Sequence, residues 1–207
     1  MSNYEVNYEA LDADEAKKTN PYEEFLEWVE TIVFAFFAVI LLFTFIVREA
    51  FVDGDSMNDT LSDGDKLIVS HLFYEPKAED IVIINCRNGY TYNENHELIK
   101  NKGLEKAIVK RVIATGGQTV DINFELGTVT VDGKILDEPY IKDLTKVDEH
   151  GHEFPVTVPQ GYVFVMGDNR MNSTDSRSPS VGFVPEEEVL GKVVFRFMPL
   201  ESFGKVE

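Results

Sequence analysis

Apolar residues gather first in one long run, from Thr31 to Val47, where seventeen consecutive residues carry no charge. As a helix the run would be about 25 Å long at roughly 1.5 Å per residue, near the lower limit for crossing a hydrocarbon core of about 30 Å. Val29 and a snorkelling Arg48 would lengthen it at either end. Because the run is apolar on all sides, it favours a membrane helix over a helix buried in a protein core. We predict a transmembrane helix over residues 29–50.

Residues 1–28 are polar and acidic, which is typical of a disordered tail, and Pro21 marks the expected start of the helix. The acidic charge, and the lack of a small-x-small site after the apolar run, argue against a cleavable signal peptide. Lys17 and Lys18 lie too far from the run to fix its orientation by charge. We expect the short tail in the cytoplasm and the larger C-terminal part outside the membrane.

From Phe51 onward, short runs of Val, Ile and aromatic residues alternate with Gly, Asp and Asn turns, a pattern typical of strands. The pair Asp132-Gly133 predicts a tight hairpin. No amphipathic run of helical length separates the strands, which argues against a parallel α/β sheet. The predicted fold class is therefore mainly β, an antiparallel sheet over residues 51–207 preceded by one transmembrane helix. Seven strands are predicted, at Lys66–Leu72, Asp80–Ile84, Ala107–Thr115, Thr119–Asn123, Gly127–Val131, Tyr162–Met166 and Gly191–Met198.

Two polar stretches interrupt the β pattern. Residues 85–106 are rich in Asn, Glu and Lys, and predict a long loop or a variable hairpin. Residues 137–159 contain three prolines and predict an irregular segment. Together with the strands before it, this second stretch predicts a small β-rich insertion at about 118–160.

The charge of the chain limits the classes of partner that it can bind. The chain has 37 acidic and 19 basic residues and a formal net charge of -18. This argues against nucleic acid as a partner and against docking on anionic lipid by charge, so any attachment to the bilayer is expected to be hydrophobic. The single cysteine, Cys86, excludes an internal disulfide. His150 and His152 are a weak metal signal, better interpreted as a surface turn, and we predict neither a metal nor a cofactor.

The first candidate for chemistry is Ser56, which lies between small, turn-forming residues just after the apolar run. Gly54 and Asp55 would bend the backbone and leave the hydroxyl uncrowded. A serine hydroxyl needs a base beside it to act as a nucleophile. An acidic surface turn is the alternative, and a calcium loop through Asp53, Asp55 and Asp59 is a third option. The calcium loop fits poorly, because the positions that should hold Gly and a bidentate Glu hold other residues.

The second candidate is Lys110, in the apolar run Ala107–Ile113. In an extended strand it shares a face with Ile108 and Val112. Burial would disfavour the ammonium, and lowering the pKa of this lysine from about 10.4 to near 7–8 would require roughly 3–5 kcal/mol. The neutral amine could then deprotonate a serine. From the strand alone, an edge strand whose lysine reaches water is the more common arrangement.

The third candidate is the polar loop from Gly167 to Arg177, which follows an apolar strand. Asp175 and Arg177 could form an ion pair within it. Ser173 could form a hydrogen bond with a buried amine. Taken alone, the loop also fits a polar turn or an anion site.

Together the three segments resemble the bacterial type I signal peptidases, membrane-anchored Ser/Lys proteases that remove secretory signal peptides. The family's G-x-S-M-x-P-T-L motif resembles residues 54–61, and its K-R-V-I-G-x-P-G-D motif resembles residues 110–118. The G-D-N-R-x-x-S-x-D-S-R motif is matched without a departure over residues 167–177, and K-x-x-D-I-V appears at 77–82. The departures change turn chemistry rather than any proton-transfer group: Asp59 replaces proline, and Ala114, Gly116 and Gln118 replace Gly, Pro and Asp.

The resemblance implies an extracytoplasmic catalytic domain at residues 51–207. In it Ser56 is the nucleophile, Lys110 is the base and Ser173 orients the lysine. Asp175 and Arg177 would hold the loop under the site. The implied substrates are secretory preproteins with small-x-small cleavage sites, met at the lipid bilayer by an enzyme anchored in the cell membrane.

Other residues of the motifs receive supporting roles from the resemblance. Gly54 stands where some family members add a hydroxyl to the oxyanion hole, so the hole would depend on the Ser56 backbone N–H. Asp168 and Asn169 would shape the loop. Met57 would pack beside the lysine, at the rim of the site that faces the membrane.

Two other readings compete with a signal peptidase. The self-cleaving repressor family shares the dyad and the β scaffold, but it lacks a membrane span and carries a DNA-binding helix-turn-helix. A membrane-anchored family member with weakened catalysis, acting as a binding or structural protein, is the second. An assay on a signal-peptide substrate, with Ser56→Ala and Lys110→Met as controls, separates the second from an enzyme.

Overall fold

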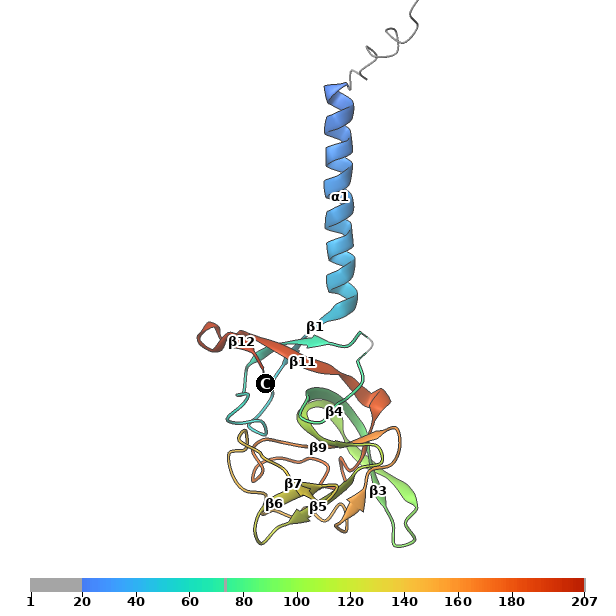
Figure 1. The fold of residues 1–207 in the computed structure, drawn as a ribbon, viewed down its shortest axis with the longest axis vertical. Coiled ribbons are helices and arrows are strands. Elements are labelled where there is room, and N and C mark those ends of the chain that lie inside the picture. Colours follow the sequence, from blue (N-terminus) through green and yellow to red (C-terminus); the bar gives the residue numbers. More distant parts are fainter. Residues whose placement is uncertain (1–19, 73, 207) are drawn as a thin grey trace, which may run out of the picture. The chain divides into compact units, whose positions relative to one another are not determined.

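The computed structural model describes residues 20–72 and 74–206, without the side chains of 42–47. These residues divide into two compact units, one ending at Thr44 and one beginning at Phe45. The first unit is most of helix α1, Pro21–Ile46 (Figure 1). The helix begins at the predicted proline, a residue suited to the first helical position, and the Asn20 side chain caps it by accepting the Tyr22 N–H at 3.1 Å.

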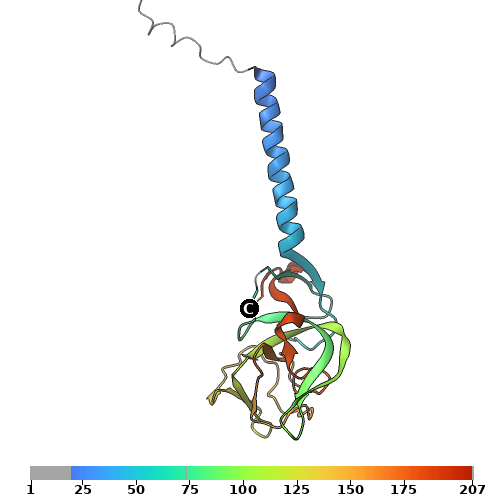
Figure 2. The same ribbon diagram turned by 90° about the vertical axis from the view of Figure 1, so that its right-hand side faces the viewer.

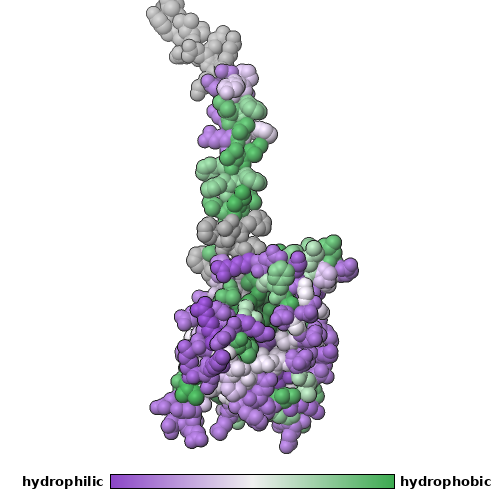
Figure 3. All heavy atoms as spheres, turned by 180° about the vertical axis from the view of Figure 1, so that it is seen from behind, coloured by the Kyte–Doolittle hydropathy of each residue, from purple (hydrophilic) through white to green (hydrophobic). Residues whose placement is uncertain are grey.

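Many side chains along α1 are apolar and exposed, as the spheres of Figure 3 show. Within the described part of the chain, no helix combines the length and the apolar character needed to cross a membrane. The helix ends at Ile46, whereas the predicted membrane segment continued to Ala50. Val47–Phe51 forms strand β1 instead, because its backbone pairs with β2, Lys66–Ser70, residue by residue from Val47 opposite Ser70.

The second unit contains an eight-stranded antiparallel main sheet (Figure 1). Its strands follow the order β1-β2-β11-β3-β4-β9-β10, and β12 pairs with β11. Two 3-10 turns, η2 at Glu186–Glu188 and η3 at Leu200–Ser202, flank β11. The antiparallel β fold is as predicted. The strands not yet given are β3, Ile81–Tyr92; β4, Leu98–Thr115; β9, Tyr162–Met166; β10, Val184–Pro185; β11, Val189–Met198; and β12, Gly204–Lys205.

A smaller sheet of four strands has the order β7-β6-β5-β8. Its strands lie within the range 118–160, where the insertion is expected. The Asp132-Gly133 hairpin is confirmed, since Val131 pairs with Lys134 and both turn residues have positive φ, at 51° and 75°. The bounds are β5, Thr119–Asn123; β6, Thr128–Val131; β7, Lys134–Ile135; and β8, Val156–Thr157.

Residues 85–106 are not a loop but the outer half of the long β3–β4 hairpin, drawn in green in Figure 2. The turn is closed by Asn93, whose side-chain oxygen accepts the backbone N–H groups of Asn95 and Glu97, both at 2.9 Å. Polar residues are tolerated here because much of the outer hairpin is exposed. The prediction of a hairpin is therefore confirmed, whereas the alternative of a loop is wrong.

The core that matters for the site lies under the turn that carries Ser56. Met57 and Leu61, both 0% exposed, pack in a cluster with Leu67, Val109 and Val193. Burying two large apolar side chains from one short turn anchors it to the main sheet, at roughly 1.5–3 kcal/mol for each side chain. The turn is therefore fixed without regular secondary structure.

Candidate active site

Lys110 lies in the interior of the main sheet, on β4, which is flanked by β3 and β9. The residue is 3% exposed. Its Nζ lies 2.7 Å from Ser56 Oγ and 2.9 Å from the Val109 carbonyl oxygen. The alternative of an exposed lysine on an edge strand is therefore wrong, because β3 and β9 pair with the two edges of β4. The serine and the lysine, 54 positions apart, lie within hydrogen-bonding distance.

Burial lowers the pKa of the Lys110 amine from its usual 10.5 to about 8, because an ammonium loses hydration in the interior. Asp175 opposes this shift by favouring the ammonium, and so does Asp168, whereas nearby Lys106 adds to it. With a pKa of about 8, roughly a tenth of the amine is neutral at pH 7. A proton acceptor is therefore present beside the Ser56 hydroxyl near neutral pH.

The nucleophile turn, residues 53–65, carries Ser56 outside any regular strand. Gly54 has a φ of +93°, a backbone conformation that favours glycine, and its N–H donates to Asp63 Oδ1 at 2.8 Å. Met57 points into the core, so Ser56 beside it stays partly exposed. This local geometry presents the hydroxyl to Lys110 while leaving one side accessible.

Asp168 and Asn169 hold the turn on either side of the serine. The Asn169 backbone N–H donates to the Ser56 carbonyl, and its side-chain amide donates to the Asp55 carbonyl, each at 3.0 Å. Asp168, fully buried, accepts the Thr60 hydroxyl at 2.6 Å. Both residues therefore contact the turn itself, and this arrangement fits the loop-shaping role implied by the resemblance.

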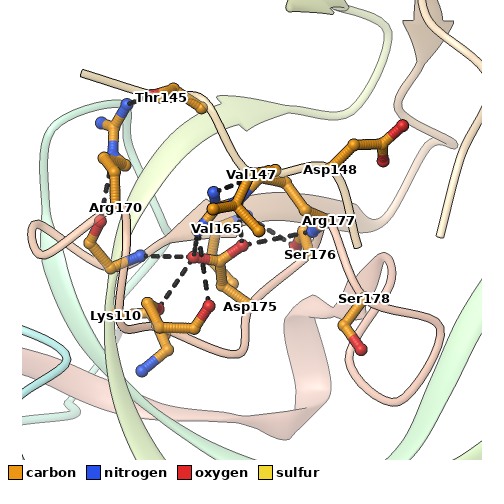
Figure 4. Close-up of polar contacts among 12 residues, drawn as sticks. Lys110, Thr145, Val147, Asp148, Val165, Arg170, Asp175, Ser176, Arg177 and Ser178 are labelled. Carbon is orange, nitrogen blue, oxygen red and sulfur yellow. Dashed lines mark hydrogen bonds and ion pairs between the residues drawn. The ribbon is translucent and has the colours of Figure 1, made fainter. Parts of the chain in front are cut away.

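A buried ion pair, Asp175 with Arg177, lies next to the lysine, as Figure 4 shows. Arg177 Nε and Nη2 donate to the two carboxylate oxygens at 2.8 Å each, and the Gly167 N–H donates to Oδ2 at 2.9 Å. Burial by itself raises the pKa of Asp175, but the bonds and charge of Arg177 outweigh it and hold that pKa below its usual range. The carboxylate therefore stays ionised inside the protein.

The Ser173 hydroxyl does not form the expected hydrogen bond with the Lys110 amine. Instead, the hydroxyl donates to Asp175 Oδ2 at 2.8 Å. Among the described residues, the hydrogen bonds of the Lys110 amine go to Ser56 and Val109 alone. The predicted bond between Ser173 and Lys110 is therefore wrong, since an ionised carboxylate two residues away is the stronger acceptor for the hydroxyl.

The chain is similar in sequence to known proteins. The family model described as "Signal peptidase, peptidase S26" matches residues 25–198. The chain belongs to the signal peptidase family. A relative named "Signal peptidase I T", from Bacillus subtilis, is 38% identical over 92% of this chain and 93% of its own length. "Probable signal peptidase I-1" from Synechocystis sp. is 36% identical over 90% and 89%. A crystal structure of a signal peptidase I from Enterococcus faecalis is 28% identical, covers 57% of this chain and 97% of its own, and has a TM-score of 0.42.

The two histidines that gave the weak metal signal, His150 and His152, lie in different surroundings. His150 is exposed, with Nδ1 3.3 Å from Asp148, as expected of a surface turn. His152 instead packs against Phe183, with ring centroids 4.3 Å apart, and burial lowers its pKa to about 4. Across the described ranges, no three His, Cys, Asp or Glu side chains are grouped so that they could hold a metal ion.

Two arginines of the site were missed by sequence reasoning. Arg111, next to the lysine, donates from Nε and Nη2 to Asp168 at 2.9 and 2.7 Å. Arg196 on β11 donates to the Thr60 carbonyl at 3.2 Å. Strand alternation predicts that Arg111 and Lys110 face opposite sides, but no local pattern names the distant carboxylate that a buried arginine requires.

Proposed function

We propose that the chain is a membrane-bound serine endopeptidase that removes signal peptides from secreted preproteins, with Ser56 as nucleophile and Lys110 as base. One observation carries the assignment of the dyad: a buried lysine amine 2.7 Å from a serine hydroxyl that stays partly exposed. The family supports the reaction class, and the geometry supports the residues.

In the acylation step, Ser56 Oγ attacks the scissile carbonyl carbon while neutral Lys110 takes the hydroxyl proton. The tetrahedral oxyanion is held by the Ser56 backbone N–H, since Gly54 brings no hydroxyl. The lysine ammonium then protonates the leaving amine, the C–N bond breaks, and the mature protein departs. The carboxyl end of the signal peptide remains as an ester on Ser56.

Deacylation uses the same two groups. Lys110, neutral again, takes a proton from a water molecule that attacks the ester carbonyl. The ester C–O bond then breaks, and the lysine returns the proton to Ser56 Oγ, so that the signal peptide leaves with a free carboxylate. Asp175 and Arg177 support this cycle as a rigid ion pair, without net charge, next to the lysine. Ser173 supports the pair by its hydrogen bond to Asp175.

We further propose that the helical residues 29–46, rather than the predicted 29–50, supply the membrane anchor, with the tail 1–28 in the cytoplasm and the sheet-forming part of the chain from Val47 onward outside. The exposed apolar side chains of α1 support this, among them Phe34 at 73% and Phe36 at 67%. A shared bilayer reduces the search for the substrate to two dimensions. Phe51, 60% exposed beside the nucleophile turn, suits a catalytic unit that rests on the outer leaflet.

The test is cleavage of a preprotein with an alanine-x-alanine site by the full chain in detergent, read by mass spectrometry of the products. We expect Ser56→Ala and Lys110→Met each to lower kcat by at least about 1,000-fold. Ser62→Ala on the same turn and Lys100→Met on β4, both exposed positions, are the matched controls and should cleave like the parent. Equal cleavage by parent and dyad variants overturns the dyad. A parent that binds the preprotein without cleaving it supports the weakened binding protein instead.

A further inference from the structure

Two buried arginines stand next to the residues that hold the proposed site. Arg111 follows Lys110 on β4, and Arg170 follows Asn169 in the loop after β9. Their side chains are 3% and 0% exposed. A guanidinium keeps its charge even when buried, so each must be paired and hydrogen-bonded inside the protein. What pairs with these arginines therefore helps to set where the two site segments lie.

One irregular stretch, residues 138–145, contacts both arginines; we call it the clamp segment. Arg170 donates to the two Glu138 carboxylate oxygens, at 2.5 and 3.2 Å, and to the Thr145 hydroxyl at 2.7 Å. The ring of Tyr140 lies against Arg111, with the guanidinium carbon 3.9 Å from the ring centroid. Stacking on an aromatic face is a favourable partner for a desolvated guanidinium.

The clamp segment also contacts Asp168 directly. The Lys142 backbone N–H donates to the Asp168 carbonyl at 3.2 Å. The Asp168 carboxylate takes both Arg111 bonds and the Thr60 hydroxyl. A continuous chain of contacts therefore runs from Tyr140 through Arg111 and Asp168 to Thr60, in the nucleophile turn.

We propose that Tyr140 is a positioning residue for catalysis: its ring fixes the plane of Arg111 and thereby the relative placement of Lys110 and the nucleophile turn. This rests on the proposed function of the Ser56–Lys110 pair. The ring acts on the face of β4 opposite the lysine, so it touches neither reacting group. The Tyr140 hydroxyl plays the smaller part, since its bond to Glu138 is long, at 3.3 Å.

The test compares Tyr140→Ala and Tyr140→Leu, which remove the aromatic face, with Tyr140→Phe, which keeps it. Misplacement of reacting groups by a fraction of an ångström lowers rate more than binding, so we expect kcat to fall about tenfold and KM to change less than about twofold. Tyr140→Phe should stay within about twofold of the parent. Asp143→Ala, at an exposed position of the clamp segment, is the matched control. Tyr140→Leu keeps most of the volume and serves where Tyr140→Ala does not fold.

A second readout needs no cleavage. Competitive acylation of lysines, followed across pH by mass spectrometry, reports the pKa of Lys110 in each folded variant. Loosening the site admits water to the amine, so we expect that pKa to rise above about 8 in Tyr140→Leu and to stay unchanged in Tyr140→Phe. The groups that act on the amine, Asp175, Lys106, Asp168 and Cys86, are intact in all variants.

The outcomes separate the two proposals. If the parent itself does not cleave the preprotein, the peptidase proposal fails, whereas a Lys110 pKa that is raised in Tyr140→Leu and unchanged in Tyr140→Phe still supports the positioning role. Normal cleavage, with unchanged kcat and unchanged titration in folded Tyr140→Leu, overturns the positioning role and leaves the peptidase standing. A loss shared equally by Tyr140→Phe also overturns it, because the ring face is intact in that variant.

Discussion

The two halves of the proposed dyad are positioned in different ways. Lys110 belongs to a strand with partners on both sides, so ladder hydrogen bonds fix its backbone and neighbouring strands exclude water. Ser56 belongs to the nucleophile turn, which no ladder holds. Two apolar anchors and polar side chains such as Asn169 and Arg196 keep it in place. The base thus depends on the fold as a whole, whereas the nucleophile depends on individual contacts.

This difference predicts how each half fails. A substitution next to the lysine changes the burial or pairing of a charge, and such a change can alter the free energy of unfolding by several kcal/mol. A substitution around the turn removes a single hydrogen bond, which contributes about 1 kcal/mol to the free energy of unfolding. Variants of the two regions should therefore differ in size of effect and in whether stability or rate changes first.

The largest effect is expected from Asp175→Ala, on the lysine side. It leaves Arg177 buried without its carboxylate and removes the acceptor of the Gly167 N–H and the Ser173 hydroxyl. We expect the free energy of unfolding to fall by about 3–5 kcal/mol, measured by urea denaturation of the full chain in detergent. Asp143→Ala, an exposed carboxylate, is the control and should change stability by less than about 0.5 kcal/mol. A loss below about 1 kcal/mol would contradict the importance of this pair.

The next effect is the pH dependence of cleavage, which also tests the lysine side. The neutral amine of Lys110 is the active form, and its pKa is about 8, so activity should be lost as pH falls below that value. We expect kcat at pH 6 to be about 100-fold below its plateau, measured with the preprotein between pH 5.5 and 9. A rate that stays flat from pH 6 to 9 contradicts the assignment of this lysine as the base.

The lowered pKa of Lys110 also determines whether the stability of the fold rises or falls with pH. The pKa of Lys110 is lower in the folded protein than its usual 10.5, so between about pH 8 and 10.5 the unfolded chain holds a proton that the folded chain has released. Stability from this group therefore rises with pH through that window. Lys110→Met should lose this rise, and an equal rise in both proteins would contradict burial of the charge.

The sequence predicts the strands best where alternation is clear and turns mark the ends, as for β5 and β9, whose bounds are as predicted. It fails where an element is too short to show a period, as for β7, β8 and β10. It fails for β1 too, because Val47–Phe51 has charged residues where the apolar run ends, and only pairing with β2 makes it a strand. Pairing partners lie outside any local window.

The contacts of the site likewise divide into those that local sequence predicts and those that it does not. Local reasoning placed Lys110 on an exposed edge, and the resemblance to a family was needed to bring it to Ser56. The Asp175–Arg177 pair was predictable, because two residues in one loop can pair locally. The Tyr140–Arg111 contact was not, since nothing near either residue specifies the other.

Asn169→Ala tests the turn side. It removes the side-chain amide that donates to the Asp55 carbonyl, while the backbone bond to Ser56 remains. We expect kcat to fall about tenfold because the turn loses one of its ties, with a small change in stability. Asn172→Ala, the same change at an exposed position of the same loop, should leave kcat unaltered. If Asn169→Ala matches this control, the turn is held by its apolar anchors alone.

The smallest effect is expected from Thr60→Val, at the far end of the turn. The change keeps the shape of the side chain and removes the hydroxyl that donates to Asp168 at 2.6 Å. Asp168 keeps both bonds from Arg111, so the carboxylate stays paired and the loss should be about 1 kcal/mol of stability. Thr174→Val, at an exposed position, is the control for urea denaturation. A loss as large as that of Asp175→Ala would show that the turn relies on buried charge as much as the lysine side does, and the contrast between the two halves would disappear.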